Sequence, residues 1–170
     1  GTGIGGPDHG GGGIFVIGSL NLTVDDSTID NNSAIRGGGI YSISGSATVH
    51  VQNGSSILAN TATDSGAGIF NNSGTLSVDD ATIMGNMASV NGGGLFLGEN
   101  TTAVSITNTS VDSNTASGSN PGLGGGGIFV DDNLTLTLDN SVTISNNMAD
   151  GALGNGGGIL VDTGATLTLN

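Results

Sequence analysis

Residues 124–140 read GGGGIFVDDNLTLTLDN and join two features that oppose each other. Four glycines precede an apolar triplet, and Leu and Thr then alternate from Leu134 to Leu138. Such alternation is typical of a β-strand with one buried face, whereas glycine inside a strand weakens it. The stretch therefore predicts short strands that begin directly after a tight corner built from glycine.

This corner phrase occurs six times, and its copies span residues 11–15, 37–41, 66–70, 92–96, 125–129 and 156–160. The Ile or Leu of each copy lies 26, 29, 26, 33 and 31 residues after the previous one, which gives a period near 26 with insertions. An apolar pair with one residue between its members follows each copy after 7 to 9 residues. After five of the pairs a third phrase follows, apolar-x-x-Asn-x-Ala. Each unit is therefore expected to hold three short strands.

A unit of this size cannot bury its own apolar face, so copies must stack on one another. The pattern predicts an all-β parallel β-helix, a β-solenoid of about six turns that forms one domain over residues 1–170. Each turn would add about 4.8 Å, the spacing of hydrogen-bonded strands. The insertions at 116–123 and 150–155 are expected on one corner.

Two further columns have structural explanations. Glycine suits a corner packed against identical corners, because it has no Cβ and tolerates positive φ. An asparagine at a buried turn can bond its own backbone and the amide of the next turn. The expected structural ladder consists of Asn32, Asn60, Asn86, Asn114 and Asn147.

The charge composition limits which classes of partner the protein can bind. The chain carries 14 acidic side chains against a single basic one, Arg36, for a formal net charge of −13. A surface of this sign repels phosphates, so nucleic acid and anionic membranes are unfavourable partners. No apolar run approaches the about 18 residues of a membrane-spanning helix, and no Cys is present to form a disulfide or bind a metal.

The GGGI phrases and the x-x-Asn phrases led by Ile or Val resemble the GGAI and FxxN repeats of chlamydial polymorphic outer-membrane proteins. They also resemble the GGGIYN-type repeats of large bacterial surface proteins, over about residues 10 to 170. The resemblance implies a right-handed parallel β-helix on a cell surface, often as an adhesin passenger. One departure is that FxxN here reads IxxN or VxxN.

Every aromatic side chain follows the apolar residue of a corner phrase, which predicts a single ladder. If the preceding Ile points inward, alternation places the rings outside as an interaction stripe. A bend at the corner would instead bury both columns. The ladder consists of Phe15, Tyr41, Phe70, Phe96 and Phe129.

Paired carboxylates follow the second strand of the first and third units, as Asp25/Asp26 and Asp79/Asp80. Units two and four place amides or hydroxyls there, which avoids stacking like charges. Solubility explains the pairs without a ligand. Calcium, which prefers such oxygen ligands, is the candidate cation.

Many pectin-cleaving enzymes use a parallel β-helix, so a glycan-active enzyme is an alternative. Glycosidases need two carboxylates across the scissile bond, and lyases acting on anionic sugars usually need a basic residue. Arg36 is the only Lys or Arg in the sequence that could serve a lyase in this way. Neither His9 nor His50 has an evident partner for a catalytic triad. The sequence therefore indicates a protein that is not an enzyme and has no cofactor.

The outward positions of the second strands are rich in Thr and Ser, which raises an ice-binding face as a further alternative. Plain β-propensity on a solvated face explains them equally, and His50 and Asn21 interrupt the pattern. These positions are Asn21/Thr23, Thr48/His50, Thr75/Ser77, Ala103/Ser105, Thr135/Thr137 and Thr166/Thr168.

The two ends of the sequence are in register with the repeat. Joining Asn170 to Gly1 places Ile4 five residues after Leu169, where other units have the apolar residue of the third strand, although Pro7 stands where Asn is expected. Subunits, or segments of a longer chain, are therefore expected to stack head to tail into filaments. The expected function is a structural extracellular or cell-surface β-solenoid in a fibre. The alternative is an adhesin that binds a glycan or a host surface protein.

Overall fold

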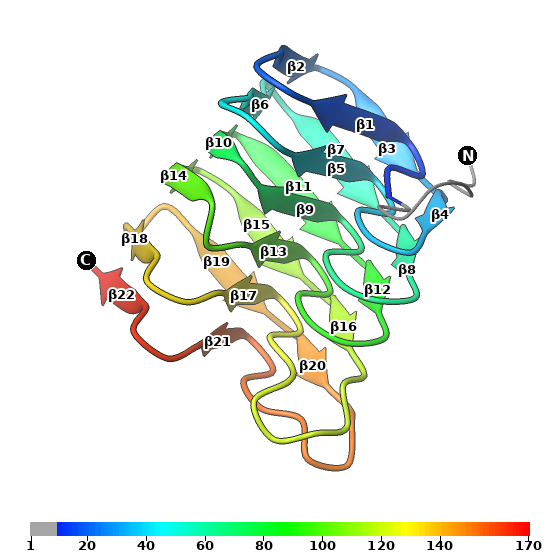
Figure 1. Cartoon of the computed structure of the whole chain (residues 1–170), viewed down its shortest axis with the longest axis vertical. Helices are drawn as coiled ribbons and strands as arrows, with labels where there is room; N and C mark the ends of the chain where they lie inside the picture. Colours follow the sequence, from blue (N-terminus) through cyan, green and yellow to red (C-terminus); the bar gives the residue numbers. More distant parts are fainter. Residues whose placement is uncertain (1–9) are drawn as a thin grey trace.

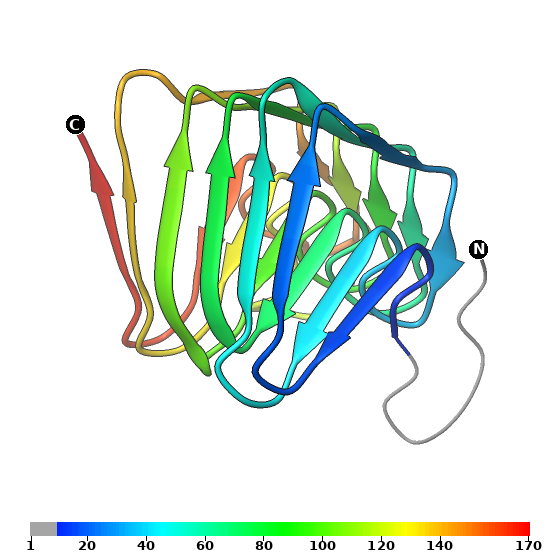
Figure 2. The same cartoon turned by 90° about the horizontal axis from the view of Figure 1, so that it is seen from above.

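The computed structural model describes residues 10–170 as a coil of parallel strands without a helix (Figure 1). Strands of successive coils lie side by side and form four sheets (Figure 2). The expectations for Ile4, Pro7 and His9 lie outside the described residues. Within them, no helix is long and apolar enough to cross a membrane.

The first two sheets have six strands each. The first sheet consists of β1 (Ile14–Ile17), β5 (Ile40–Ile43), β9 (Ile69–Asn72), β13 (Leu95–Leu97), β17 (Ile128–Val130) and β21 (Ile159–Val161). The second sheet consists of β2 (Asn21–Asp25), β6 (Thr48–Gln52), β10 (Gly74–Asp79), β14 (Thr101–Thr107), β18 (Thr135–Leu138) and β22 (Thr166–Leu169).

The other two sheets have five strands each. The third sheet consists of β3 (Thr28–Asp30), β7 (Ser55–Leu58), β11 (Ala81–Met84), β15 (Ser110–Asp112) and β19 (Thr143–Ser145). The fourth sheet consists of β4 (Ser33–Ala34), β8 (Thr61–Ala62), β12 (Met87–Ala88), β16 (Thr115–Ala116) and β20 (Met148–Ala149).

The fourth, two-residue strand is a correction to the expected three strands per turn. A residue with positive φ interrupts the third phrase directly before the ladder asparagine and bends the chain there. In the first coil this residue is Asn31, with φ 52°, and in the third coil it is Gly85, with φ 65°. The apolar-x-x-Asn-x-Ala phrase therefore forms two strands, one in the third sheet and one in the fourth.

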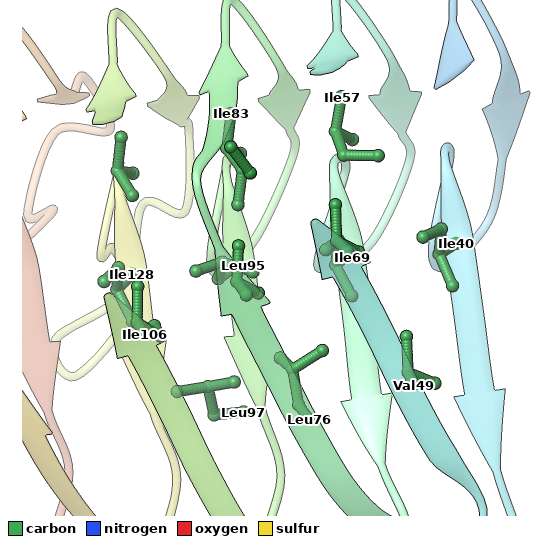
Figure 3. Packing of buried hydrophobic residues seen from close by; sticks show 14 of the residues in the cluster. Ile40, Val49, Ile57, Ile69, Leu76, Ile83, Leu95, Leu97, Ile106 and Ile128 are labelled. Carbon is green, nitrogen blue, oxygen red and sulfur yellow. The ribbon is translucent and has the colours of Figure 1, made fainter. Parts of the chain in front are cut away.

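The core fills the inside of the coil with columns that hold one residue per coil, most of them apolar. Ile40, Val49 and Ile57 come from three sheets of one coil and are all fully buried (Figure 3). The next coil presents Ile69, Leu76 and Ile83 at the paired positions. Because each repeat places its apolar residues at the same positions, the core is continuous from coil to coil.

The asparagine ladder runs along the third and fourth sheets as the spacing predicts. In Asn86, Nδ2 donates to the Asn114 Oδ1 (2.9 Å) and to the backbone oxygen of Ile57 (3.0 Å). Its Oδ1 accepts from the backbone nitrogen (2.9 Å) and Nδ2 (3.1 Å) of Asn60. The amide is thus fully satisfied inside the coil, where an unpaired polar group would be costly.

The glycine corners fold tightly over the strand that follows them. Gly37 adopts φ +57°, and a Cβ added there would lie 2.5 Å from the Cβ of Tyr41. The two long insertions lie on one corner, as expected, and project together in Figure 1. They are tied by the backbone nitrogen of Asn155, which donates to the oxygen of Leu123 (2.9 Å).

Candidate functional site

A notch interrupts the corner between the first and second sheets. Only Ser73 separates β9 from β10, whereas residues 44–47 separate β5 from β6 and residues 98–100 separate β13 from β14. The short connection of the third coil therefore lies between two longer ones. A cleft of about 520 Å³ opens at this place, within the about 300–1,000 Å³ typical of small-molecule sites.

The cleft has a mixed lining drawn from three coils. Polar groups come from the second to fourth coils, and two rings of the aromatic column add apolar surface. The described lining includes Arg36, Tyr41, Ser44, Phe70, Asn72 and Asn100. Sequence reasoning missed this cleft, although one signal was present: the spacing from corner Ile to apolar pair is 7 residues at Ile69 and Leu76, the shortest of the six.

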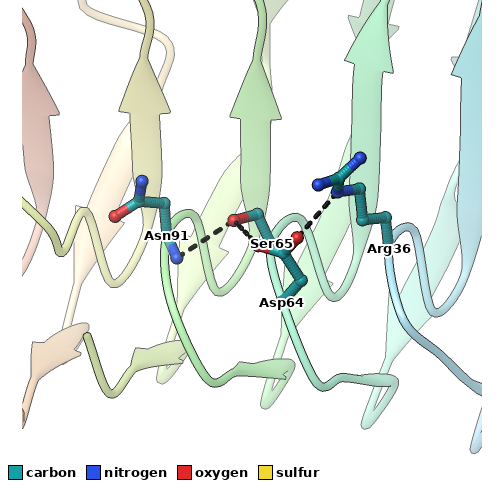
Figure 4. A network of polar contacts seen from close by, with 4 residues as sticks. All are labelled: Arg36, Asp64, Ser65 and Asn91. Carbon is teal, nitrogen blue, oxygen red and sulfur yellow. Dashed lines mark hydrogen bonds and ion pairs between the residues drawn. The ribbon is translucent and has the colours of Figure 1, made fainter.

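A polar network fixes the position of Arg36 (Figure 4). The Arg36 Nε donates to the Asp64 Oδ2 at 2.8 Å, and the Ser65 Oγ donates to the other oxygen of Asp64 at 2.9 Å. The Asn91 backbone nitrogen then donates to the Ser65 Oγ (3.3 Å). The network crosses successive coils at the position just before the glycine corner, so it holds the guanidinium beside the cleft.

The Arg36 side chain stays charged and its charge is balanced. Burial lowers the pKa of Arg36, but the hydrogen bond and charge of Asp64 outweigh it, with a contribution from Tyr41, and the pKa rises above its ordinary value. The guanidinium carbon lies 5.8 Å from the ring centroid of Phe70, within cation–π range. Asp64 engages only Nε, and Tyr41 also hydrogen-bonds the Arg36 side chain.

Asn72 and Asn100 form the polar edge of the cleft. The Asn72 Oδ1 accepts from the backbone nitrogen of Asn100 (3.0 Å) and from its Nδ2 (3.2 Å). Among the described residues, the Asn72 Nδ2 donates no hydrogen bond. The side chain is half-buried. This amide is therefore oriented with donors available to a ligand.

The one-residue connection is possible because polar groups replace apolar ones inside the coil. The buried Asn71 Nδ2 donates to the Ser73 oxygen and to the Thr101 Oγ1, both at 3.0 Å. In the same column the second coil has Ser42, whose Oγ lies 3.0 Å from the Ser73 Oγ. The Asn71 Oδ1 is buried without a hydrogen bond from the described residues, so this acceptor carries an uncompensated desolvation cost.

The aromatic column lies outside the main core cluster, as alternation predicts, yet it is not an open stripe. Tyr41, Phe70 and Phe129 are buried, Phe96 is half-buried, and Phe15 is 46% exposed. The rings cover one another, with centroids 4.4 to 5.4 Å apart. A role as an interaction stripe stays a prediction, and Phe15 and Phe96 are the rings with free surface for it.

The stack changes geometry at the cleft. Tyr41 and Phe70 are 64° apart in plane, whereas the other three ring pairs are within 20° of parallel. Edge-to-face and offset stacked pairs are both favourable. The break in parallel stacking thus coincides with the notch and with Arg36.

The predicted calcium residues lie apart and are bonded by amides. The Asp25 Oδ2 accepts from the Gln52 Nε2 (2.6 Å) and the Asn53 Nδ2 (2.8 Å). Hydrogen bonds from Thr107 and Asn108 likewise hold the pKa of Asp79 below its ordinary value. The alternation of acids with neutral donors therefore serves the stacking itself, and Asp26 and Asp80 occupy turn positions with positive φ.

A different acidic cluster forms on the corner that carries the cleft. Asp131, Asp132 and Asp162 have carboxylate oxygens within 4.8 Å of one another. Burial raises the pKa of Asp131, the charges of Asp132 and Asp162 add to this, and backbone hydrogen bonds from Asp132 and Glu99 oppose it. Asp131 and Asp132 are neighbours in the sequence, but the sequence does not show that Asp162 comes next to them one coil later.

Asp131→Asn is expected to stabilise the protein at neutral pH. A raised pKa in the folded state means that the charged form of Asp131 disfavours folding at pH 7, and this cost disappears below the unfolded pKa, near 3.9. Because the group is partly exposed, we expect a rise in Tm of about 1–3 °C at pH 7 and no difference below about pH 4. Thermal unfolding followed by circular dichroism measures both; Asp79→Asn, whose pKa shift has the opposite sign, should lower Tm at pH 7.

The second sheet presents the outward Thr and Ser positions in register, for example Thr75 beside Thr48 and Thr137 beside Thr168. His50 stands between Thr23 and Ser77 in this array. The pairing of β14 with β18 includes a single register pair, Ile106 with Leu138. The array is thus least regular between its fourth and fifth strands, and an ice-binding role stays an untested alternative.

The architecture defines a parallel β-solenoid whose surface carries a corner cleft. The family model described as the right-handed β-helix region matches residues 8–170. The chain therefore belongs to the right-handed β-helix family. None of the curated proteins or the solved structures matches it, and the narrower resemblance to chlamydial repeats gains no support from these comparisons.

Proposed function

We propose that the chain is a structural, non-catalytic β-solenoid that stacks end to end as a segment of an extracellular or cell-surface fibre. The observation that carries the proposal is the exposure of apolar side chains on the last coil. Leu169 is 68% exposed, whereas Leu138, its partner in the same column, is 3% exposed. An apolar column that is buried in every inner coil thus reaches an open strand edge here.

The edge itself also favours stacking. Within residues 10–170, β21 pairs only with β17 and β22 pairs only with β18. Unpaired strand edges with apolar side chains readily accept a further strand. A contact of this head-to-tail kind does not close on itself and generates filaments. The covering coil can come from the same polypeptide or from a second chain.

Sedimentation velocity on the 170-residue chain tests the stacking. We expect oligomers whose size grows with protein concentration, and a shift to monomer in Leu169→Glu. Leu153→Glu is the matched control, because Leu153 is also well exposed, at 56%, but lies in the insertion between β20 and β21. A wild-type chain that stays monomeric at high concentration contradicts the proposal.

Adhesion is the second candidate, and the corner cleft favours it. An adhesin needs a surface that recognises a glycan or a host protein, and this cleft combines convergent polar groups with aromatic rings. Its described lining contains no carboxylate, so a pair of catalytic acids is not placed there. Neither candidate role involves catalysis.

A further inference from the structure

We propose that the notch at Ser73 is a binding site for an uncharged sugar unit, such as the end or a branch of a neutral glycan. The inference rests on the adhesion role and is independent of stacking. Its basis is the juxtaposition of Arg36, Tyr41 and Phe70 with Asn72 and Asn100 in one cleft of about 520 Å³.

The polar groups match the hydrogen bonding of sugar hydroxyls. Each hydroxyl both donates and accepts, and a carboxamide offers both functions side by side. The bonds from Asn100 hold the Asn72 Oδ1 in place and leave its Nδ2 to donate. The Arg36 Nε is fixed on Asp64 and the side chain also hydrogen-bonds Tyr41, so the guanidinium is held in one orientation and only its N–H groups beyond these two bonds are further donors.

The apolar groups lie beneath the polar ones, as the floor of the cleft. Tyr41 and Phe70 contribute to the lining at the one step of the column where the rings cross at 64°. Both are held from outside the cleft by their neighbours Phe15 and Phe96, at 5.4 and 4.4 Å between centroids. Because the two rings are only 2% and 6% exposed, they act as a rigid floor, and the fixed amides above them supply the main contacts to a sugar.

The charges favour a neutral ligand over an acidic one. Asp64 lies 2.8 Å from Arg36 and balances its charge. The remainder of the chain is strongly acidic, with a net charge of −13. The long-range field therefore repels anions, and a uronate or sialic acid would meet this repulsion without an unpaired cation to offset it.

Two-dimensional NMR of the ¹⁵N-labelled 170-residue chain tests the proposal. The probes are lactose, maltotriose and N,N′-diacetylchitobiose as neutral sugars, with digalacturonate as the acidic comparison. We expect at least one neutral probe to shift the signals of the Arg36 Nε and of the Asn72 and Asn100 side-chain amides at millimolar concentration. Translational diffusion in the same samples reports self-association, so failure of binding and failure of stacking are read separately.

Two variants locate the site. Asn72→Asp retains the oxygen that accepts from Asn100 but loses the Nδ2 donor, and should weaken binding roughly 5- to 10-fold, as expected for one hydrogen bond. Asn100→Ala removes an exposed amide and should also weaken binding. Asn140→Asp makes the same chemical change at an exposed turn outside the cleft and should leave affinity unchanged.

Three results would overturn the proposal. The first is the absence of shifts with all three neutral probes. The second is equal affinity of the wild type and Asn72→Asp, which would place binding elsewhere. The third is tighter binding of digalacturonate than of every neutral probe, which would show that the charge of Arg36 governs the site.

Discussion

Gly94→Ala should lower the free energy of unfolding by about 3 kcal/mol, at the upper end of the usual cost of overpacking. A Cβ added at Gly94 would lie 2.6 Å from the backbone oxygen of Gly127 and 3.0 Å from the Asn114 Nδ2. That oxygen cannot move freely, because it accepts the hydrogen bond of the Leu95 nitrogen at 2.9 Å. Relief of the clash therefore requires two coils to separate locally.

Urea denaturation followed by circular dichroism, at a concentration where the chain is monomeric, measures this cost, and Gly158→Ala is its matched control. Gly158 occupies the same column two coils later, where a Cβ would meet only the Cγ2 of Ile144, at 3.4 Å. In that variant we expect a change within about 0.5 kcal/mol. If both variants lose the same stability, crowding between coils is not the reason for glycine in this column.

The fold could be predicted from the sequence because contacts between coils, such as the one that requires Gly94, recur in every repeat. Each inner position of a solenoid meets its own equivalent in the next coil, so a steric requirement recurs once per repeat. Gly94 and Asn86 are therefore visible as members of columns without knowledge of any distance. The family match over residues 8–170 agrees with the fold inferred in this way.

The candidate site could not be predicted to the same extent, because it arises where the repeat is broken. The cleft depends on the single-residue connection at Ser73 and on the longer connections in the coils before and after it. Differences in connection length were visible in the spacing of the apolar pairs, but the sequence does not show which side chains turn into the gap. In the sequence, nothing distinguishes Asn72 and Asn100 from other polar turn residues.

The sequence left the burial of the aromatic column open between an outward stripe and a corner that buries both columns. Alternation indicates that Tyr41 points away from the core, and this is how the strand is oriented. Exposure depends in addition on the neighbouring rings and on the corner, which leave Tyr41 only 2% exposed. The acidic residues give the same lesson, because Asp162 comes close to Asp131 through the stacking of coils rather than through sequence proximity.

Asn86→Ala should lower the free energy of unfolding by about 4 kcal/mol, since several buried groups lose a partner at about 1–3 kcal/mol each. The Asn60 backbone nitrogen and its Nδ2 both donate to the Asn86 Oδ1, and the Ile57 oxygen accepts from the Asn86 Nδ2. Alanine can replace none of these atoms. Urea denaturation gives the difference, and hydrogen exchange should show the largest loss of protection at the Asn60 amide.

The position along the ladder decides how much each asparagine contributes. Asn147 ends the ladder in the described chain, is half-buried, and makes the corresponding bonds to Asn114 and to the Val111 oxygen. Asn147→Ala should therefore cost less than Asn86→Ala, because removal of a half-buried side chain leaves a space that is open to water, which can replace part of the lost bonds. Asn140→Ala, at an exposed turn, should change stability by less than about 0.5 kcal/mol. Equal losses at Asn86 and Asn147 would contradict the role of burial, and no loss at Asn86 would mean that the ladder does not hold the coils together.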